Sequence, residues 1–144
     1  HSQKIATIQA SINDGPMKDL VQFISITTDP VNDTPDVLRD YGELHGLNTA
    51  NWDLLTKTPD QPEDATRVLA RDYGLEFTMM ADSDMMMHGA VTHVIDIGGR
   101  FAGKFHGMNF KNVNLILYVS ELINNAQHRK RERSWWDRLT GVFQ

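Results

Sequence analysis

The stretch ISITTDPVNDTPDVLRDYGELHGLNTANWDLLT (residues 24–56) decides the fold. It begins inside the run LVQFISITT at residues 20–28, whose β-branched and aromatic side chains alternate little, as in a central strand buried on both faces. Thr-Pro-Asp at residues 34–36 has the composition of a helix N-terminus, and Gly46 is placed to end that helix. The sequence WDLLT at residues 52–56 predicts a second short strand. Strand, helix and strand in this order predict parallel pairing in an α/β domain.

Three further helices are predicted from apolar residues at helical spacing, in residues 5–12, 61–73 and 112–126. The first of these helices begins almost at the chain terminus and has no strand before it. We therefore expect that a strand belongs before His1.

A hairpin is predicted after the third helix of the chain. Residues 91–97 and 101–105 each alternate between apolar and polar side chains, and Gly98-Gly99 between them suits a tight turn. Together with one strand before the first helix, these elements would give a thioredoxin-like arrangement. We predict an α/β, thioredoxin-like fold in which helices flank a central mixed sheet, truncated at its N-terminus.

The formal net charge of -5 is unevenly distributed along the chain. Residues 128–144 carry five Lys or Arg against two Asp or Glu, which leaves -8 for residues 1–127. Such a negative charge in residues 1–127 argues against binding to nucleic acid, because affinity for nucleic acid depends mainly on neutralising its phosphates. We predict a domain in residues 1–127 and a basic amphipathic tail in residues 128–144.

The tail has an interfacial composition. Ser134 can cap a short helix that places apolar residues on one side: Trp135, Trp136, Leu139, Val142 and Phe143. Tryptophan beside arginine suits the surface of an anionic membrane. Packing on the body of the domain, or disorder, are alternatives that the pattern leaves open.

The chain has no cysteine. Disulfides, thiol catalysis and thiolate metal sites are therefore excluded within these residues. Soft-metal or redox chemistry would need sulfur from methionine or from a segment outside the sequence.

Several motifs resemble the Sco/SenC family. The stretch quoted first has that family's strand ending in Asp-Pro, its Asp-Thr-Pro helix start and its Trp with a Leu-Thr strand, and VLARDYGLEF (residues 68–77) and THVIDIGGRFAGKF (residues 92–105) are further matches. The resemblance runs from about Leu20 to Ala126 at consistent spacing. It implies a thioredoxin-like copper chaperone rather than an enzyme. Such a chaperone would bind copper as Cu(I) or Cu(II) and deliver it to the dinuclear copper site of cytochrome c oxidase.

The resemblance also implies partners and a location. The partners are the copper-bearing subunit of the oxidase and other copper chaperones. The location is the periplasmic face of the cytoplasmic membrane, or the intermembrane-space side of the inner mitochondrial membrane, with the anchor outside these residues.

The family's copper site combines two cysteines of a Cys-x-x-x-Cys motif at the start of the first helix with one histidine near the hairpin. His93 occupies the position of that histidine, and the cysteines would lie immediately before His1. We therefore expect the present chain to bind copper weakly or not at all. Thr92 stands where family members commonly have Asp. Residue pattern alone favours a core histidine, because His93 shares a strand face with Val91 and Ile95.

Two other groups of residues are candidates near the site. His88 and Met87, within a methionine-rich run at residues 85–88, could form a second copper contact, or the run could be a loop that only packs. Asp29 and Asp33 lie after the first strand, where they could shape the loop beside the copper site or serve only as turn and cap residues.

Two other functions remain open. A thiol-disulfide reductase or peroxidase on the same fold would use the upstream cysteines without metal and would not need His93. A redox-inert binding module would have no upstream cysteines at all.

Overall fold

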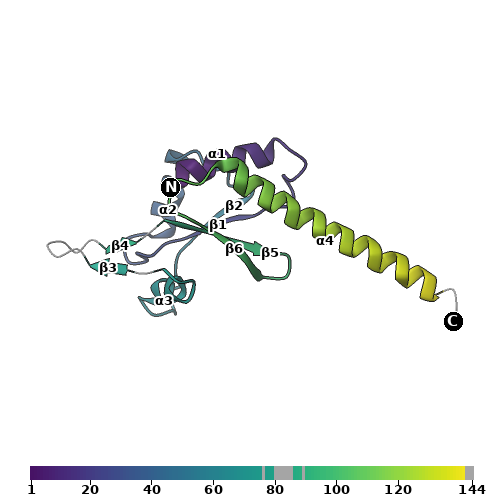
Figure 1. The fold of residues 1–144 in the computed structure, drawn as a ribbon. Helices are drawn as coiled ribbons and strands as arrows, with labels where there is room; N and C mark the ends of the chain where they lie inside the picture. Colours follow the sequence, from purple (N-terminus) through teal and green to yellow (C-terminus); the bar gives the residue numbers. More distant parts are fainter. Residues whose placement is uncertain (76, 80–85, 89, 142–144) are drawn as a thin grey trace. The chain divides into compact units, whose positions relative to one another are not determined.

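A computed structural model describes residues 1–144 except 76, 80–85, 89 and 142–144, and it describes side chains for residues 1–75 and 90–130. The elements, in chain order (Figure 1), are α1 (Ser2–Asn13), β1 (Phe23–Ile26), α2 (Pro35–Leu44), β2 (Trp52–Leu55), α3 (Ala65–Asp72), β3 (Phe77–Met79), β4 (Met86–His88), β5 (Val91–Asp96), β6 (Arg100–His106) and α4 (Asn112–Gly141). The chain forms two compact units. The first comprises residues 1–91 and 106–108, and the second comprises residues 92–105 and 109–144.

The parallel pair β1 and β2 lies in the first unit, as the sequence predicts. Phe23 is opposite Trp52 in the register, and their rings lie 5.4 Å apart. The indole nitrogen of Trp52 donates a hydrogen bond to the hydroxyl of Ser25 over 3.0 Å. The buried Trp52 therefore packs and hydrogen-bonds across the strand pair, which satisfies its one polar group.

The prediction that the first strand is buried on both faces is wrong. Burial alternates along β1, and Ile24 and Ile26 are 58% and 43% exposed. Successive side chains of a strand point to opposite faces, and only the face that carries Phe23 and Ser25 is covered, while the face that carries Ile24 and Ile26 is exposed.

Helix α2 begins and ends as its sequence predicts. The side chain of Thr34 accepts a hydrogen bond from the backbone of Val37, Pro35 occupies the first turn, and Gly46 has a φ of 65° after the last turn. Helix α3 begins later than predicted, at Ala65, because the residues from Gln61 form turns.

Helix α1 supplies much of the core of the first unit. Ile5, Ile8 and Ile12 are buried at helical spacing, as predicted. On the same helix Gln9 is only 2% exposed. Its amide nitrogen donates to the carbonyl of Asn48 and to Oδ1 of Asn51, each over 2.8 Å. This buried polar residue fixes α1 to the segment that leads into β2.

The strand pair β3 and β4 is not predicted by the sequence. Its antiparallel register sets Phe77 opposite His88, Thr78 opposite Met87 and Met79 opposite Met86. Part of the methionine-rich run is therefore a strand. Met85 lies outside the described residues, and the side chains of residues 86–88 do as well.

In the second unit β5 and β6 form the predicted hairpin. Gly98 and Gly99 have φ values of 91° and 79°, which side chains with a Cβ rarely adopt. Helix α4 packs on this hairpin through Tyr118, whose hydroxyl donates to the carbonyl of Ala102 over 2.6 Å. Gly103 makes room for this contact, because a Cβ there would lie 3.0 Å from the hydroxyl of Tyr118.

Helix α4 is longer than predicted. It continues without interruption past Ala126 to Gly141, so Ser134 is an interior helix residue and not the cap of a separate helix. Arg, Lys, Glu and Gln dominate residues 127–133 and have high helix propensity, which explains the continuation. Val142 and Phe143 lie outside the described residues.

Candidate metal centre

The candidate ligand His93 lies in the middle of β5, in the second unit. Burial along this strand is greatest at Val94, which points to the opposite face, while His93 is half-buried. The imidazole lies 5.9 Å from the ring of Phe101, at an interplanar angle of 58°.

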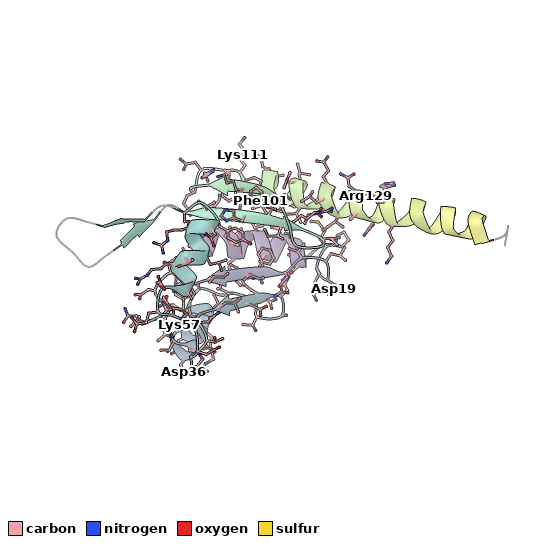
Figure 2. All side chains as sticks on the ribbon, turned by 90° about the horizontal axis from the view of Figure 1, so that it is seen from below. Asp19, Asp36, Lys57, Phe101, Lys111 and Arg129 are labelled. Carbon is pink, nitrogen blue, oxygen red and sulfur yellow. The ribbon has the colours of Figure 1, made fainter. Side chains whose placement is uncertain are left out.

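Phe101 belongs to the neighbouring strand β6, and its side chain is 58% exposed (Figure 2). The imidazole of His93 therefore stands beside an aromatic ring that is open to solvent, and not inside a closed core. A half-buried imidazole in a rigid hairpin can be oriented by its neighbours and still be reached by a metal ion.

The part of the chain that the structure describes does not provide a complete copper site. Among the described residues no three His, Asp or Glu side chains are grouped closely enough to hold a metal ion, and the sequence has no cysteine. Cu(I) prefers thiolate and thioether ligands, so one imidazole is insufficient for tight binding. The imidazole of His93 could serve as one nitrogen ligand, and tight binding of Cu(I) would also require sulfur ligands.

Asp29 and Asp33 lie in the first unit, in the turn that follows β1. The backbone N–H groups of Asn32 and Asp33 donate to the carbonyl of Asp29 over 3.2 and 2.9 Å. The side chain of Asp33 accepts from the hydroxyl of Thr27, and that hydroxyl accepts from the backbone N–H of Asp29 over 2.9 Å. The carboxylate of Asp29 accepts a hydrogen bond from Nδ2 of Asn32 over 2.8 Å, so both carboxylates have partners within the turn. His93 belongs to the other unit.

Arg67 of α3 also contacts this turn, although the sequence does not mark it as a site residue. Its Nε donates to the carbonyl of Thr28 over 2.8 Å, and its guanidinium lies 3.8 Å from the carboxylate of Asp29. No local motif marks this residue, because the contact joins positions far apart in the chain. The charge of Asp29 is thereby partly compensated at a site that is still accessible to water.

The other histidines occupy varied positions. His106 and His128 are exposed, as expected for surface residues. His45 is half-buried at the end of α2, where its ring lies 4.2 Å from that of Tyr41. His88 ends β4, and neither its side chain nor that of Met87 belongs to the described part of the structure. In that described part, every helix is too short or too polar to cross a lipid bilayer.

The structure is similar to several solved protein structures. A SCO1/SenC family lipoprotein from Bacillus anthracis matches with a TM-score of 0.69 and 25% identity, over 85% of this chain and 70% of that one. Arabidopsis thaliana ScoI, solved with copper bound, matches with a TM-score of 0.65 and 24% identity, over 86% and 73% of the two chains. Yeast Sco1, also solved with copper bound, gives a TM-score of 0.63 and 19% identity, over 88% and 66%. These likenesses confirm the thioredoxin-like α/β fold.

A search of curated proteins found no match. The SCO1/SenC family model, in contrast, matches residues 2–123, which include α1, the turn after β1, the hairpin with His93 and the packed half of α4. The chain therefore belongs to the SCO1/SenC family.

Proposed function

We propose that this chain is the body of a copper chaperone that delivers copper to the dinuclear copper site of cytochrome c oxidase. Two kinds of observation support the proposal: membership of the SCO1/SenC family and the copper bound in the related Arabidopsis and yeast structures. The observation that carries it within this chain is the position of His93, half-buried on β5 beside the exposed ring of Phe101.

In this proposal His93 is the only nitrogen ligand that the chain contributes. A neutral imidazole nitrogen can bind copper in either oxidation state, whereas thiolates favour Cu(I). Two cysteines of a Cys-x-x-x-Cys segment immediately before His1 supply the thiolates. Such a segment would lie at the N-terminus of α1, where an N-terminal helix position also lowers the pKa of a thiol.

Thiol-disulfide exchange is the second candidate function, and the thioredoxin-like fold favours it. It would use the same two cysteines but no metal, so His93 would be dispensable. Copper delivery instead requires both the thiolates and the imidazole.

The experiment that separates these functions uses the chain extended by the residues that its gene encodes before His1. We expect His93→Ala to weaken Cu(I) binding, measured by competition with a chromophoric chelator, by at least about tenfold, since even loss of an outer partner of a ligand costs that much. His106→Ala, which removes an exposed histidine of β6, is the matched control and should bind Cu(I) normally.

Exchange activity is measured on the same variants with a dithiol substrate. The copper proposal predicts that His93→Ala loses copper and keeps exchange. Unchanged Cu(I) affinity in His93→Ala, or the absence of a Cys-x-x-x-Cys segment before His1, would contradict the proposal and favour the reductase or the redox-inert module.

A second contact for copper is proposed at the methionine-rich run that ends in β4. Methionine sulfur is soft and its side chain is adaptable, which suits transient contact with Cu(I) during transfer. Replacing Met85, Met86 and Met87 together by Leu should slow copper transfer and leave equilibrium affinity at the His93 site unchanged. An unchanged transfer rate would leave the run a purely structural segment.

The proposed partners are the copper-bearing oxidase subunit and the chaperones that load this protein. We place the protein on the outward face of the membrane that houses the oxidase, periplasmic or in the intermembrane space. The lipoprotein from Bacillus anthracis supports a membrane-associated location for the family.

A further inference from the structure

Helix α4 has a packed face, which contacts the hairpin through Tyr118 and ends at Ala126. Its members share helical spacing and are buried or half-buried: Leu115, Tyr118, Val119, Leu122 and Ala126. Tyr118 anchors this face to the hairpin through Ala102 and through an edge-to-face contact with Phe105, whose ring lies 6.0 Å away. From Gln127 to Lys130 all side chains are exposed.

The packed face does not resume in the last part of the helix. The same side of α4 continues, at helical spacing, through Arg129, Arg133, Asp137 and Thr140. All four positions are polar. The C-terminal part of α4, residues 128–141, is therefore not patterned to extend the contact that the N-terminal part makes with the hairpin.

A second apolar stripe begins on another side of the same helix. Trp135, Trp136 and Leu139 lie within one turn of each other, and their mean direction is roughly 110° around the axis from the packed face at 3.6 residues per turn. Because α4 is continuous from Asn112 to Gly141, this angle is fixed by the helix itself. A separate short helix could have rotated its apolar side back onto the hairpin, but an uninterrupted helix cannot.

The stripe is flanked by positive charge on both sides. Arg131 and Arg138 occupy positions along one edge, and Arg129 and Arg133 occupy positions along the other. The side chain of Arg129 is exposed on α4 (Figure 2). Residues 128–144 carry five Lys or Arg against Glu132 and Asp137, a net charge of +3 that contrasts with -8 in the rest of the chain. Glu132 lies on the same side of the helix as the stripe, one turn before it, so positive charge predominates around the stripe but is not its only charge.

We propose that the C-terminal part of α4 lies on the surface of an anionic lipid bilayer. Tryptophan and leucine would enter the boundary between headgroups and acyl chains, and the flanking arginines would contact anionic headgroups. The charge pattern selects this partner, because an acidic surface is complementary to the tail and would repel the rest of the chain. The proposal does not depend on copper binding.

The test measures binding of the full chain to vesicles of phosphatidylcholine with phosphatidylglycerol, and to vesicles of phosphatidylcholine alone. We expect co-sedimentation with the anionic vesicles, a blue shift of tryptophan emission, and loss of binding at high salt. The variant with Trp135→Ala and Trp136→Ala should bind at least about tenfold more weakly. Trp52 is buried, so it reports no shift in this variant and checks that the fold is kept.

A matched charge control separates the tail from general electrostatics. The variant Arg129→Gln, Arg131→Gln and Arg133→Gln should lose binding, while Lys18→Gln, Lys104→Gln and Lys111→Gln, three exposed cations elsewhere, should not. Equal loss in both variants would overturn the proposal. A second result would also overturn the proposal. If the protein sediments as a dimer without lipid, and as a monomer once Trp135 and Trp136 are replaced, then a second copy of the chain covers the stripe.

Discussion

Gln9 in α1 and Asn51, the residue directly before β2, are buried side chains joined by a hydrogen bond of 2.8 Å from Nε2 to Oδ1. Asn51 also exchanges two hydrogen bonds with Asn13, of 3.1 and 2.8 Å, and donates to the carbonyl of Val21 over 3.0 Å. Each amide in this cluster is satisfied, so the polar groups cost little to bury and fix one arrangement of α1.

Replacing Gln9 by Leu should destabilise the protein by about 1–3 kcal/mol, because the backbone N–H and carbonyl of Asn48 lose their partner inside the fold. Urea unfolding measures this loss. Gln3→Leu, on the exposed side of the same helix, is the control and should lie within about 0.5 kcal/mol of the wild type. Equal stability of the two variants would show that the amide cluster contributes nothing.

Gly103→Ala tests the close packing of β6 against α4. A Cβ would lie 3.0 Å from the hydroxyl and 3.3 Å from ring carbons of Tyr118, and the bond to Ala102 holds that ring in place. Thermal or urea unfolding should show a loss of about 1–3 kcal/mol. In a double-mutant cycle with Tyr118→Phe, the two losses should be less than additive. Strict additivity would mean that the ring does not constrain residue 103.

Asp33→Ala tests whether the Asp33 side chain stabilises the turn after β1. The hydroxyl of Thr27 loses its acceptor, and we expect a loss of about 1 kcal/mol in stability. Asp40→Ala, an exposed carboxylate on α2, should change stability by less than about 0.5 kcal/mol. If Asp33 also contacts a partner protein, Asp33→Ala should slow copper transfer more than its loss of stability explains. An unchanged transfer rate would show that Asp33 serves only to stabilise the turn.

The hydrogen bond between Thr58 and Asp60 makes a pH-dependent contribution to stability. The hydroxyl of Thr58 donates to the Asp60 carboxylate over 2.6 Å, and this bond lowers the pKa of Asp60 below its ordinary value. Because this pKa is lowered in the folded state, the ionised Asp60 stabilises the fold at pH values above its unfolded pKa. This stabilisation is lost as the pH falls through the folded pKa. Thr58→Val should therefore raise the pKa of Asp60 toward the ordinary value, as followed by NMR of its carboxyl carbon. A pKa that stays lowered in this variant would assign the shift to other groups.

Much of the fold could be predicted because local chemistry determines it. The cap at Thr34, the glycine pair in the hairpin and the isoleucine spacing of α1 each specify an element through neighbouring residues. The parallel pairing of β1 and β2 follows from the order of the elements. The position of His93 in the hairpin follows from the alternation of residues 91–97, whereas its role as a copper ligand rests on the resemblance to the family, because alternation alone favours a core histidine.

The remaining features depend on contacts or competing tendencies that no local motif records. Arg67 meets Asp29, and Gln9 meets Asn51, across wide separations in the chain. The sequence does not predict strand β4, because a run of methionines has no marked strand pattern. The strand forms through its antiparallel pairing with β3. The change of composition at residue 128 resembles a structural boundary, but the same residues favour helix, and α4 continues through them.

Copper X-ray absorption on the chain extended by the residues before His1 tests the central claim most directly. The proposed site predicts one imidazole nitrogen and two sulfur ligands for Cu(I), and His93→Ala should remove the nitrogen and leave the sulfurs. His106→Ala should give the wild-type spectrum. A spectrum that contains no nitrogen ligand, or one that is unchanged in His93→Ala, would contradict the assignment of His93 as the copper ligand of this chain.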